Sequence, residues 1–378
     1  MKKLLFLTES LSGGGAEKVL VTLLKNLDRT KFEVTLGCVV DSGPYVDEVK
    51  PYVCYKRFLP NPTNLKGLSL YAYKFKYKCI YQWLPFWLVY YLFLPHDSDV
   101  EIAFVEGYAT KLLAHSTNKK AKKIAWVHID LNKFHWTQSV FPSKVQETKS
   151  YNEYDVIVAV SNSVKNAFHQ CFPLVNQPVV TIYNTIDSST IIDMSKDGLD
   201  YSDADSFKIV SVGRMAQQKA FDRLLHVVSK LKRDGFLFKL WLLGDGEQRK
   251  YLEQIIKEEQ IEDTVTLWGF QTNPYKYMSK CDLFVCSSIA EGYSTAVTEA
   301  LILGLPIITT NCSGMAELLK GGECGLITEN DEISLYEGLK RILSNSQLLE
   351  FYRKKSVERG KQFSTKRLIE QVDTLLMA

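Results

Sequence analysis

Short apolar strand-like runs alternate with longer helical patterns along nearly the whole chain, and this alternation limits the fold more than any other feature. Strands that alternate with helices predict parallel βαβ units, with helices on both faces of a sheet. The strand-like runs lie at 3–8, 33–40, 100–105, 123–128, 155–160 and 179–183, and then at 207–213, 239–244, 265–269, 282–287 and 306–310. The pattern therefore predicts an α/β fold of two doubly wound, Rossmann-like domains that face each other across a cleft. Ligands of such domains bind outside the carboxyl ends of the strands.

The length of 378 residues is sufficient for two domains of ordinary size. A polar segment at 187–206, rich in Ser and Asp and weak in periodicity, separates the two series of strands and is typical of a linker. We therefore expect an N-terminal domain over residues 1–187, a C-terminal domain over 188–362, and a last helical segment over 363–378.

The composition narrows the class of protein. Apolar residues make up 46% and charged residues 24%, as in an ordinary globular protein, and the net charge of +3 does not indicate a nucleic-acid partner. The N-terminal apolar run LLFL is too short for a secretory signal, and no unbroken apolar run reaches the roughly 18 residues of a membrane span. Eight cysteines without a CxxC pair predict buried, reduced thiols in a cytoplasmic protein, and no metal centre.

A glycine-rich loop follows the first predicted strand, with glycines at 13–15 and a helix from about Ala16. Glycines let a backbone approach a ligand closely, and a helix N-terminus attracts anions. A dinucleotide-binding GxGxxG pattern would need a glycine in place of Lys18, although Asp41 after the second strand suits the ribose of NAD. A phosphate loop, a structural turn and an incomplete NAD site of an oxidoreductase all remain open from this segment.

Two cations follow the strand that ends at Gly213. Arg214 and Lys219 stand between this strand and the next predicted helix, where a diphosphate would lie in a doubly wound domain. An arginine offers a fork of donors for phosphate oxygens, and a lysine offers a compact charge. Two solvated surface cations would explain the same residues equally well.

The segment at 287–310 carries the clearest signal. A strand ends near its start, and Ser294 and Thr295 open a helix whose free N–H groups would attract an anion. Glu291 in the loop and Glu299 on the helix would flank that anion, and carboxylates in such positions suit the hydroxyl groups of a ribose or a sugar. A solvated helix face explains Glu299 less well, because its neighbours on the helix are mostly apolar.

On these residues the chain resembles the retaining, two-domain GT-B glycosyltransferases of family 4, over nearly its whole length. The most specific likeness is the E-x7-E pattern that Glu291 and Glu299 form in EGYSTAVTE. The segment VGRMAQQKAFD resembles the family's Gly-Arg…Lys-Gly-Phe-Asp element, with Ala220 where glycine is usual. Further matches in the family's order are SGGGAE, VSNSVKNAF, TIYNTID and GDGEQRKYL.

The resemblance implies roles for the matching positions. Arg214 and Lys219 would bind the diphosphate of a nucleotide-sugar donor, Glu299 the ribose hydroxyls, and Glu291 the hydroxyls of the donor sugar. The N–H groups of the helix that Ser294 and Thr295 open would add to the charge stabilisation of the leaving diphosphate.

The remaining donor contacts are also implied by the resemblance. Gly14 and Gly15 would close over the diphosphate, and the nucleobase would rest near Gly269, Phe270 and Gln271. His128 fits the position of a family histidine that faces the donor sugar. His135 is a nearby rival, and a purely structural histidine is a further alternative for His128.

The family's chemistry would transfer a hexose with retention of configuration and without a metal ion or other cofactor. UDP is the nucleotide favoured by family frequency. The acceptor hydroxyl would attack from the leaving-group side, and the departing phosphate oxygen would take its proton. By the same resemblance the N-terminal domain would bind the acceptor, the C-terminal domain would bind the nucleotide-sugar donor, and the last helix, 363–378, would cross back to the first domain.

An aromatic segment, residues 71–94, interleaves Lys74, Lys76 and Lys78 with tyrosines and tryptophans. Such a mixture suits an anionic membrane surface, but a packed helix pair inside the first domain would explain it equally well. The membrane interpretation fits transferases of bacterial cell-surface polysaccharide synthesis, which act on lipid-linked glycans at the inner face of the cell membrane. Alternative functions are an NAD-dependent oxidoreductase and a GT-B sugar-nucleotide epimerase.

Overall fold

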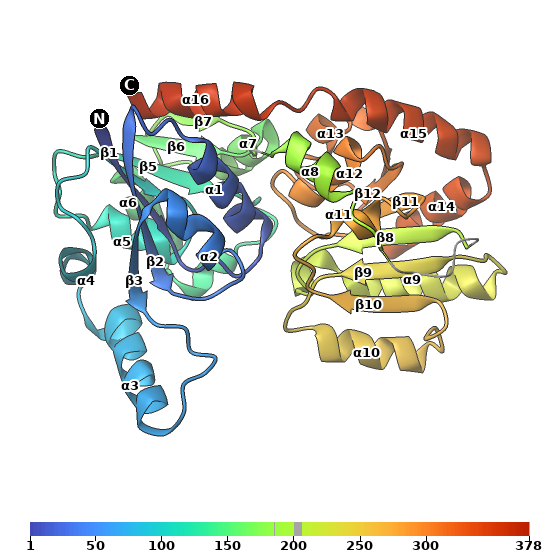
Figure 1. The fold of residues 1–378 in the computed structure, drawn as a ribbon, viewed down its shortest axis with the longest axis horizontal. Coiled ribbons are helices and arrows are strands. Elements are labelled where there is room, and N and C mark those ends of the chain that lie inside the picture. The colour runs from blue at the N-terminus through green and yellow to red at the C-terminus, as the bar shows by residue number, and fades with distance from the viewer. Residues whose placement is uncertain (185, 200–205, 378) are drawn as a thin grey trace. The chain divides into compact units, whose positions relative to one another are not determined.

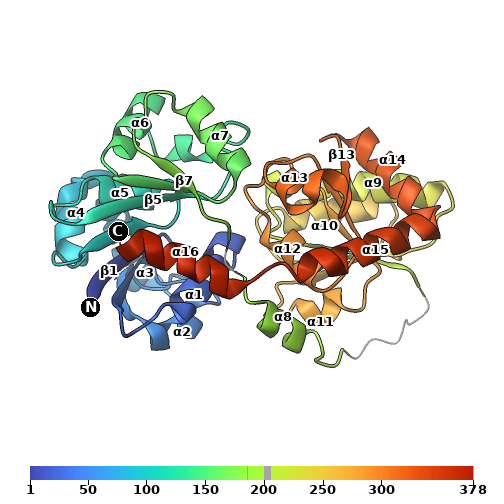
Figure 2. The same cartoon turned by 90° about the horizontal axis from the view of Figure 1, so that it is seen from above.

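The structure, a computed structural model, describes residues 1–184, 186–199 and 206–377. The chain divides into two compact units (Figures 1 and 2). Unit 1 comprises Met1–Thr185 together with Lys366–Ala378, and unit 2 comprises Ile186–Thr365. No helix among the described residues is both long enough and apolar enough to cross a bilayer.

The described residues of unit 1 form a seven-stranded parallel sheet in the order β3-β2-β1-β4-β5-β6-β7. The central strand β1 is buried on both faces from Leu4 to Leu7, as a parallel strand covered by helices requires. The strands are β1 (Lys2–Thr8), β2 (Phe32–Val40), β3 (Cys54–Leu59), β4 (Val100–Ala103), β5 (Lys122–Val127), β6 (Val156–Ala159) and β7 (Val179–Thr181).

Helices between the strands cover both faces of the sheet, and α16 joins this unit after the chain has passed through unit 2 (Figure 1). They are α1 (Gly15–Asn26), α2 (Val46–Val49), η1 (Lys50–Tyr52), α3 (Gly67–Lys78), η2 (Cys79–Trp83), α4 (Phe86–Phe93), α5 (Tyr108–Ala114), η3 (Trp136–Ser139), α6 (Lys144–Asn152), α7 (Asn162–Cys171) and α16 (Thr365–Met377). The aromatic segment therefore spans most of α3, all of η2, which is a single turn of π-helix, and α4.

The described part of unit 2 repeats this architecture with a six-stranded parallel sheet in the order β10-β9-β8-β11-β12-β13. Its strands are β8 (Lys208–Val212), β9 (Lys239–Leu243), β10 (Val265–Gly269), β11 (Leu283–Cys286), β12 (Ile307–Thr310) and β13 (Leu326–Thr328). Its helices are α8 (Ser188–Met194), η4 (Gln217–Lys219), α9 (Phe221–Arg233), α10 (Arg249–Glu258), α11 (Tyr275–Met278), α12 (Thr295–Ile302), α13 (Met315–Leu318), η5 (Lys320–Gly322), α14 (Glu332–Leu343) and α15 (Ser346–Gly360).

Each sheet has one position at which the strand order reverses. In unit 1 the chain moves outward from β1 to β3 and then returns to place β4 on the other side of β1. In unit 2 it moves outward from β8 to β10 and returns to place β11 beside β8. Connections leave the two central strands in opposite directions there, which opens a crevice at their carboxyl ends. The loops after β1, β4, β8 and β11 are therefore the places where a ligand is expected.

The C-terminal helix α16 lies against the opposite, amino-terminal ends of the unit 1 strands. Lys2, at the start of β1, donates to the carbonyl oxygens of Leu376 at 3.2 Å and Met377 at 2.7 Å. Lys122, at the start of β5, donates to the Leu375 carbonyl oxygen at 2.9 Å. These lysines satisfy the carbonyl groups at the end of the helix and complement its dipole.

The strands predicted from the sequence are all present with ends within about two residues, but two edge strands were missed, β3 and β13. The segment predicted as a linker is partly wrong: it contains helix α8, which begins because the Asp187 carboxylate accepts a hydrogen bond from the Thr190 N–H at 3.1 Å. Residues 200–205 of the predicted linker lie outside the described residues.

The cysteine prediction needs one correction. Each of the eight cysteines is free of a disulfide, and six of them are buried, but Cys54 is exposed and Cys79 is half-buried. Cys54 begins the edge strand β3, and Cys79 begins η2, so neither faces the core of its unit.

Ala220 joins η4 to α9 in a left-handed backbone conformation, with φ 47° and ψ 47°. We expect Ala220→Gly to raise the free energy of unfolding by about 1 kcal/mol, because glycine adopts this conformation without the steric cost of a Cβ. Chemical denaturation of both proteins measures the difference.

The matched control is Ala216→Gly, four residues earlier, where φ is −127°. There the change only adds freedom to the unfolded chain and should destabilise the protein by about 0.5 kcal/mol. Equal losses of stability in both variants would show that the left-handed conformation at Ala220 stores no strain.

Candidate functional site

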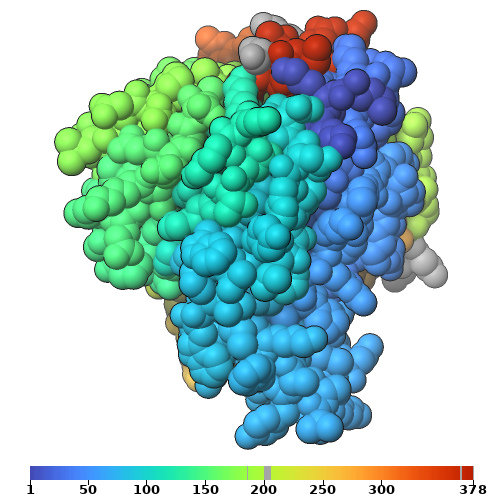
Figure 3. All heavy atoms as spheres, turned by 90° about the vertical axis from the view of Figure 1, so that its left-hand side faces the viewer, coloured from blue at the N-terminus to red at the C-terminus, as the bar shows by residue number. Residues whose placement is uncertain are grey.

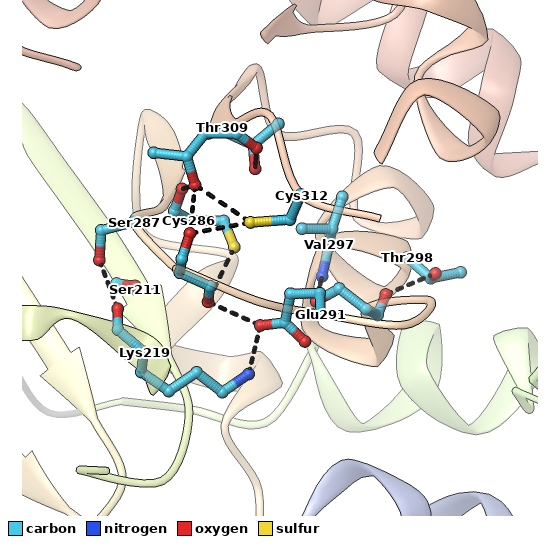
Figure 4. Close-up of polar contacts among 12 residues, drawn as sticks. Ser211, Lys219, Cys286, Ser287, Glu291, Val297, Thr298, Thr309 and Cys312 are labelled. Carbon is cyan, nitrogen blue, oxygen red and sulfur yellow. Dashed lines mark hydrogen bonds and ion pairs between the residues drawn. The ribbon is translucent and has the colours of Figure 1, made fainter. Parts of the chain in front are cut away.

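The loops after β8 and β11 bring Lys219 and Glu291 together at the reversal point of unit 2. The Lys219 Nζ lies 2.6 Å from Glu291 Oε1, and both side chains are largely buried, with 16% and 10% of their surface exposed. Figure 4 shows the two side chains pointing toward each other. The pair links two segments that are 72 residues apart in sequence.

Backbone and hydroxyl hydrogen bonds fix the two loops against each other. Ser287 Oγ donates to the Lys219 carbonyl oxygen at 2.8 Å, and the Ile289 N–H donates to the Gln218 carbonyl oxygen at 2.7 Å. Ser288 Oγ donates to Glu291 Oε1 at 2.6 Å. The loops therefore hold the two side chains in contact, so the ion pair does not require two otherwise mobile side chains to become ordered.

The pair leaves hydrogen-bonding capacity on both partners. Burial alone would lower the pKa of Lys219, but the Glu291 carboxylate attracts the charge and accepts its hydrogen bond, so the pKa lies above its ordinary value. The ammonium group has three N–H donors and uses one of them here. Glu291 Oε1 accepts from Lys219 and Ser288, whereas Oε2 makes no hydrogen bond with the described residues.

Two glycines let the chain close up around this pair. A Cβ on Gly213 would lie 3.2 Å from Cε of Lys219, so the lysine side chain runs directly along this residue. Gly314 has φ 78°, and a Cβ there would lie 2.1 Å from the Gly292 carbonyl oxygen in the loop that carries Glu291. A cavity of only about 10 Å³, lined by both members of the pair, lies beside them. A cavity of this size has room for about one water molecule and not for a larger ligand.

Helix α12 starts beside Glu291. Ser294 caps it by accepting a hydrogen bond from the Val297 N–H at 3.4 Å, so the helix geometry leaves the N–H groups of Thr295 and Ala296 without intrahelical partners. Glu299 is 3% exposed and accepts a hydrogen bond from the Tyr275 hydroxyl at 3.2 Å. It is not on a solvated helix face, which removes that alternative.

The other unit 2 positions lie on nearby strand ends. Arg214 is exposed in the loop after β8. Gly269 ends the edge strand β10 with φ 68°, and Phe270 beside it is exposed. Gln271 Nε2 donates to the Trp268 carbonyl oxygen at 2.7 Å, which folds this loop back on its strand.

In unit 1 the glycine loop leads into α1 as expected. Gly14 is the N-cap residue and provides no side-chain cap, and Gly15 is the first helical residue. The first-turn N–H groups therefore have no capping side chain at this end. Asp41, the acid that an NAD site would need, is nearly buried and accepts hydrogen bonds from Tyr55 at 3.0 Å and Arg57 at 2.8 Å. These internal partners explain Asp41 without a dinucleotide.

His128 follows β5 and is held by its neighbours. Its Nε2 lies 2.8 Å from the Phe104 carbonyl oxygen, which fixes the ring proton on that nitrogen, and burial lowers its pKa to about 4. The imidazole is therefore neutral near pH 7. Its Nδ1 is buried and makes no hydrogen bond within the described part of the chain. The rival His135 instead bonds the buried carboxylate of Glu147 at 2.8 Å, which gives it a structural partner.

Glu106, which the sequence analysis did not single out, supports His128. Its Oε2 accepts a hydrogen bond from the His128 backbone N–H at 3.1 Å, and its Oε1 accepts one from Trp136 Nε1 at 3.4 Å. Glu106 follows β4 by three residues, and Ser288 follows β11 by two. Their positions just after parallel strands, where ligands of such sheets bind, are the signal that could have indicated both residues.

The structures of known proteins place the fold in a class. HepE of Anabaena, solved in complex with UDP and glucose, superposes with a TM-score of 0.79 at 20% sequence identity, covering 100% of both chains. Sucrose-phosphate synthase from Thermosynechococcus elongatus superposes with a TM-score of 0.78 at 17% identity, covering 99% of this chain and 98% of that one. With its two doubly wound parallel sheets, the chain has the two-domain, Rossmann-like GT-B fold.

Sequence comparisons then give the family. Residues 13–190 match Glycosyltransferase Family 4, and residues 201–362 match Glycosyl transferases group 1. The chain is 32% identical over 372 residues to the N-acetylgalactosamine-N,N'-diacetylbacillosaminyl-diphospho-undecaprenol 4-alpha-N-acetylgalactosaminyltransferase of Campylobacter jejuni, covering 96% of each. It is 26% identical to an uncharacterized glycosyltransferase of Haemophilus influenzae, covering 98% of this chain and 99% of the relative. The chain belongs to the GT-B glycosyltransferases of family 4 and transfers a sugar from a nucleotide-sugar donor.

Glu106 supplies a pH-dependent test of this region. Burial raises its pKa to about 7 from the ordinary value of 4.5, so the folded chain binds more protons than the unfolded chain between these pH values. Stability is therefore lost as the pH rises through this window. We expect Glu106→Gln, relative to the wild type, to gain about 2 to 3 kcal/mol in free energy of unfolding between pH 5 and pH 8.

Denaturant titrations of both proteins at several pH values measure this difference. Glu153→Gln, at an exposed position after α6, provides the control curve. A wild-type-minus-variant difference that stays constant from pH 5 to pH 8 would contradict the raised pKa of Glu106.

Proposed function

We propose that the chain is a retaining hexosyltransferase that uses a UDP-sugar and no metal ion, and that it acts on a lipid-linked glycan in cell-surface polysaccharide synthesis. The observation that carries the donor half of this proposal is the Lys219–Glu291 pair at the reversal point of the unit 2 sheet. The pair supports the proposal because an ammonium group can bind a diphosphate and a carboxylate beside it can bind sugar hydroxyls, the two kinds of group in a nucleotide-sugar.

Each donor group has a proposed set of contacts. Lys219, Arg214 and the N–H groups at the start of α12, at Ser294 and Thr295, bind the diphosphate. Glu291 binds hydroxyls of the sugar through Oε2, and Glu299 binds the ribose. The nucleobase rests near Gly269, Phe270 and Gln271, whereas Gly14 and Gly15 of unit 1 close over the diphosphate.

The oxidoreductase alternative is not supported, because Asp41 has internal partners.

The proposed chemistry rests on charge stabilisation. When the bond between the anomeric carbon and the phosphate oxygen breaks, negative charge develops on the leaving diphosphate, and Lys219 and Arg214 stabilise it. The acceptor hydroxyl forms the new bond on the same face of the sugar, and its proton moves to the departing phosphate oxygen. His128 is neutral near pH 7 and would contact the donor sugar as an uncharged ring.

The proposal of UDP follows the ligands of proteins with this fold. HepE was solved with UDP and with UDP-glucose, and Staphylococcus aureus TarM was solved with UDP. The proposal of a lipid-linked acceptor follows the name of the Campylobacter relative, which specifies a sugar on diphospho-undecaprenol.

The aromatic segment supports a membrane surface as the place of the reaction. Helix α3 has no buried residue, and Lys74, Lys76 and Lys78 on it are exposed. Figure 3 shows this part of the chain, in light blue, projecting at one end of unit 1. The exposed large apolar residues of this segment are Tyr71, Phe75, Tyr77, Trp83, Trp87, Tyr91 and Leu92. Leu68, just before the segment, is exposed as well. Aromatic rings and lysines on one projection suit the interface of an anionic bilayer, so we place the protein peripherally at the inner face of the cell membrane.

Donor binding can be tested by melting the protein with UDP, GDP, ADP and their sugars. A ligand that binds only the folded chain raises the melting temperature, and we expect UDP and a UDP-sugar to do so.

Lys219→Ala should lower turnover by about 10²- to 10³-fold, because it removes one donor to the developing charge. Turnover is measured as UDP release in the presence of acceptor.

The control is Lys257→Ala on α10, which removes an exposed lysine of the same unit and should leave turnover at the wild-type level. A Lys219→Ala variant with normal turnover would contradict the diphosphate assignment. A melting temperature raised by GDP or ADP and not by UDP would contradict the choice of nucleotide.

Membrane contact can be tested by vesicle sedimentation. Replacement of Lys74, Lys76 and Lys78 by serine should release the protein from vesicles that contain anionic lipid, since each basic residue near such a surface contributes about 1 kcal/mol. The expected result is at least a tenfold lower bound fraction at limiting lipid.

Replacement of Lys250, Lys257 and Lys280 by serine provides a control with the same loss of net charge, on exposed positions of unit 2. If both triple variants sediment like the wild type, the aromatic segment is not a membrane surface.

A further inference from the structure

The reversal point of the unit 1 sheet carries a polar pair, Glu9 and Tyr81. Glu9 is the first residue after β1, and its Oε1 accepts a hydrogen bond from the Tyr81 hydroxyl at 2.8 Å. This is the position in unit 1 that corresponds to the Lys219 side of unit 2, because β1 and β8 are each the strand beside which the order reverses.

The backbone on both sides of this pair is well fixed. The Glu9 carbonyl oxygen accepts a hydrogen bond from the Val40 N–H at 2.9 Å, which ties the residue to the end of β2. The Tyr81 ring lies 4.3 Å from the ring of Tyr108, the first residue of α5, which follows β4. The Tyr108 hydroxyl donates to the Ile80 carbonyl oxygen at 2.8 Å. Residues after β1 and after β4, the two strands of the reversal point, thus hold Tyr81 between them.

The electrostatics of Glu9 differ from those of the unit 2 site. Glu9 is half-buried, and burial raises the pKa of its carboxyl although the hydrogen bond from Tyr81 opposes part of this effect. Within the described residues Glu9 has no cationic partner, and its Oε2 makes no hydrogen bond. A carboxylate without a cation repels a diphosphate, but it is a strong acceptor for a hydroxyl group. The chemistry of this position therefore fits a neutral ligand that donates hydrogen bonds.

An apolar surface adjoins the pair. The ring of Tyr77 is stacked on that of Tyr81, with centroids 4.2 Å apart, and 38% of Tyr77 is exposed. A half-exposed aromatic face beside a hydrogen-bonding carboxylate is the combination that sites for amphipathic small molecules use. Sugars are amphipathic in this sense, with C–H groups on one face and hydroxyls at the rim.

We propose that Glu9 and Tyr81 bind hydroxyl groups of the acceptor sugar, with the Tyr77 ring against its apolar face. This inference rests on the proposed function, in which the acceptor is a lipid-linked glycan. Tyr77 and Tyr81 belong to the aromatic segment, so one element would contact both the membrane surface and the sugar that the lipid presents. Glu9 and Tyr81 are then binding residues that select the acceptor, whereas most of the proposed donor contacts belong to unit 2.

The experiment measures KM for each substrate separately in the full-length protein. The acceptor is undecaprenyl diphosphate bearing an N-acetylhexosamine in mixed vesicles, and the donors are UDP-N-acetylglucosamine and UDP-N-acetylgalactosamine. Glu9→Gln keeps the shape of the side chain and removes its charge, and Tyr81→Phe removes only the hydroxyl. Each change should raise the acceptor KM by about 10- to 100-fold, since each weakens a hydrogen bond to a charged group. The donor KM and the UDP-induced rise in melting temperature should change less than about twofold.

Tyr55→Phe is the matched control, because the Tyr55 hydroxyl also donates to a carboxylate, that of Asp41, at 3.0 Å but away from the reversal point. It should lower stability without changing the acceptor KM. If Glu9→Gln does not fold, Tyr81→Phe and Tyr77→Leu give the same test without altering the charge.

Three results would overturn this inference. An unchanged acceptor KM in folded Glu9→Gln and Tyr81→Phe would show that the pair is structural. A rise in the donor KM of the same size would assign the pair to the donor. If the wild type binds UDP but transfers no sugar to the lipid-linked acceptor, the proposed function itself fails, and this subsite fails with it.

Discussion

The contact between Lys219 and Glu291 is the interaction on which the proposed donor site of unit 2 depends. It joins the loops after β8 and β11, and hydrogen bonds from Ser287 and Ser288 make it part of the loop architecture. A buried charge pair costs desolvation energy and contributes little net stability. Its main effect here is therefore to fix the position of the Lys219 ammonium group. It holds an ammonium group, with N–H donors to spare, at the carboxyl ends of the two strands where ligands of such sheets bind.

In both units the strand order reverses beside a central strand, but the residues that follow this strand carry opposite charges. In unit 2 the loop after the central strand carries cations, which suits a donor diphosphate. In unit 1 the residue after the central strand is Glu9, which has no cationic partner among the described residues, and glycines open the following helix. A doubly wound sheet thus fixes where a ligand is bound, whereas a few residues after each strand decide whether that ligand is anionic or neutral. Unit 1 also holds the buried carboxylate of Glu106 against the backbone of His128, whose ring is neutral.

The sequence was sufficient for most of the framework because buried parallel strands contain continuous apolar runs, as in β1 and β11. It was insufficient for the edge strands β3 and β13. Strand β3 is partly exposed and β13 has only three residues, so neither contains a continuous buried apolar run. Lys219 and Glu291 were each identified from their place after a strand. Their mutual bond could not be, since it depends on β8 and β11 being neighbours. The carbonyl partner of His128, at Phe104, follows a strand adjacent to β5 and was hidden for the same reason.

The position of α16 has a practical consequence for dissecting the molecule. Unit 1 is assembled from both ends of the polypeptide, because its last helix is separated from the rest of it by the whole of unit 2. A fragment cut after β7 would leave Lys2 and Lys122 without the helix carbonyls that they bond and would uncover the surface on which Val372 and Leu376 are now buried. An isolated first half would therefore need the terminal helix grafted onto it by a short connector, whereas the second half is one uninterrupted stretch that can be excised directly.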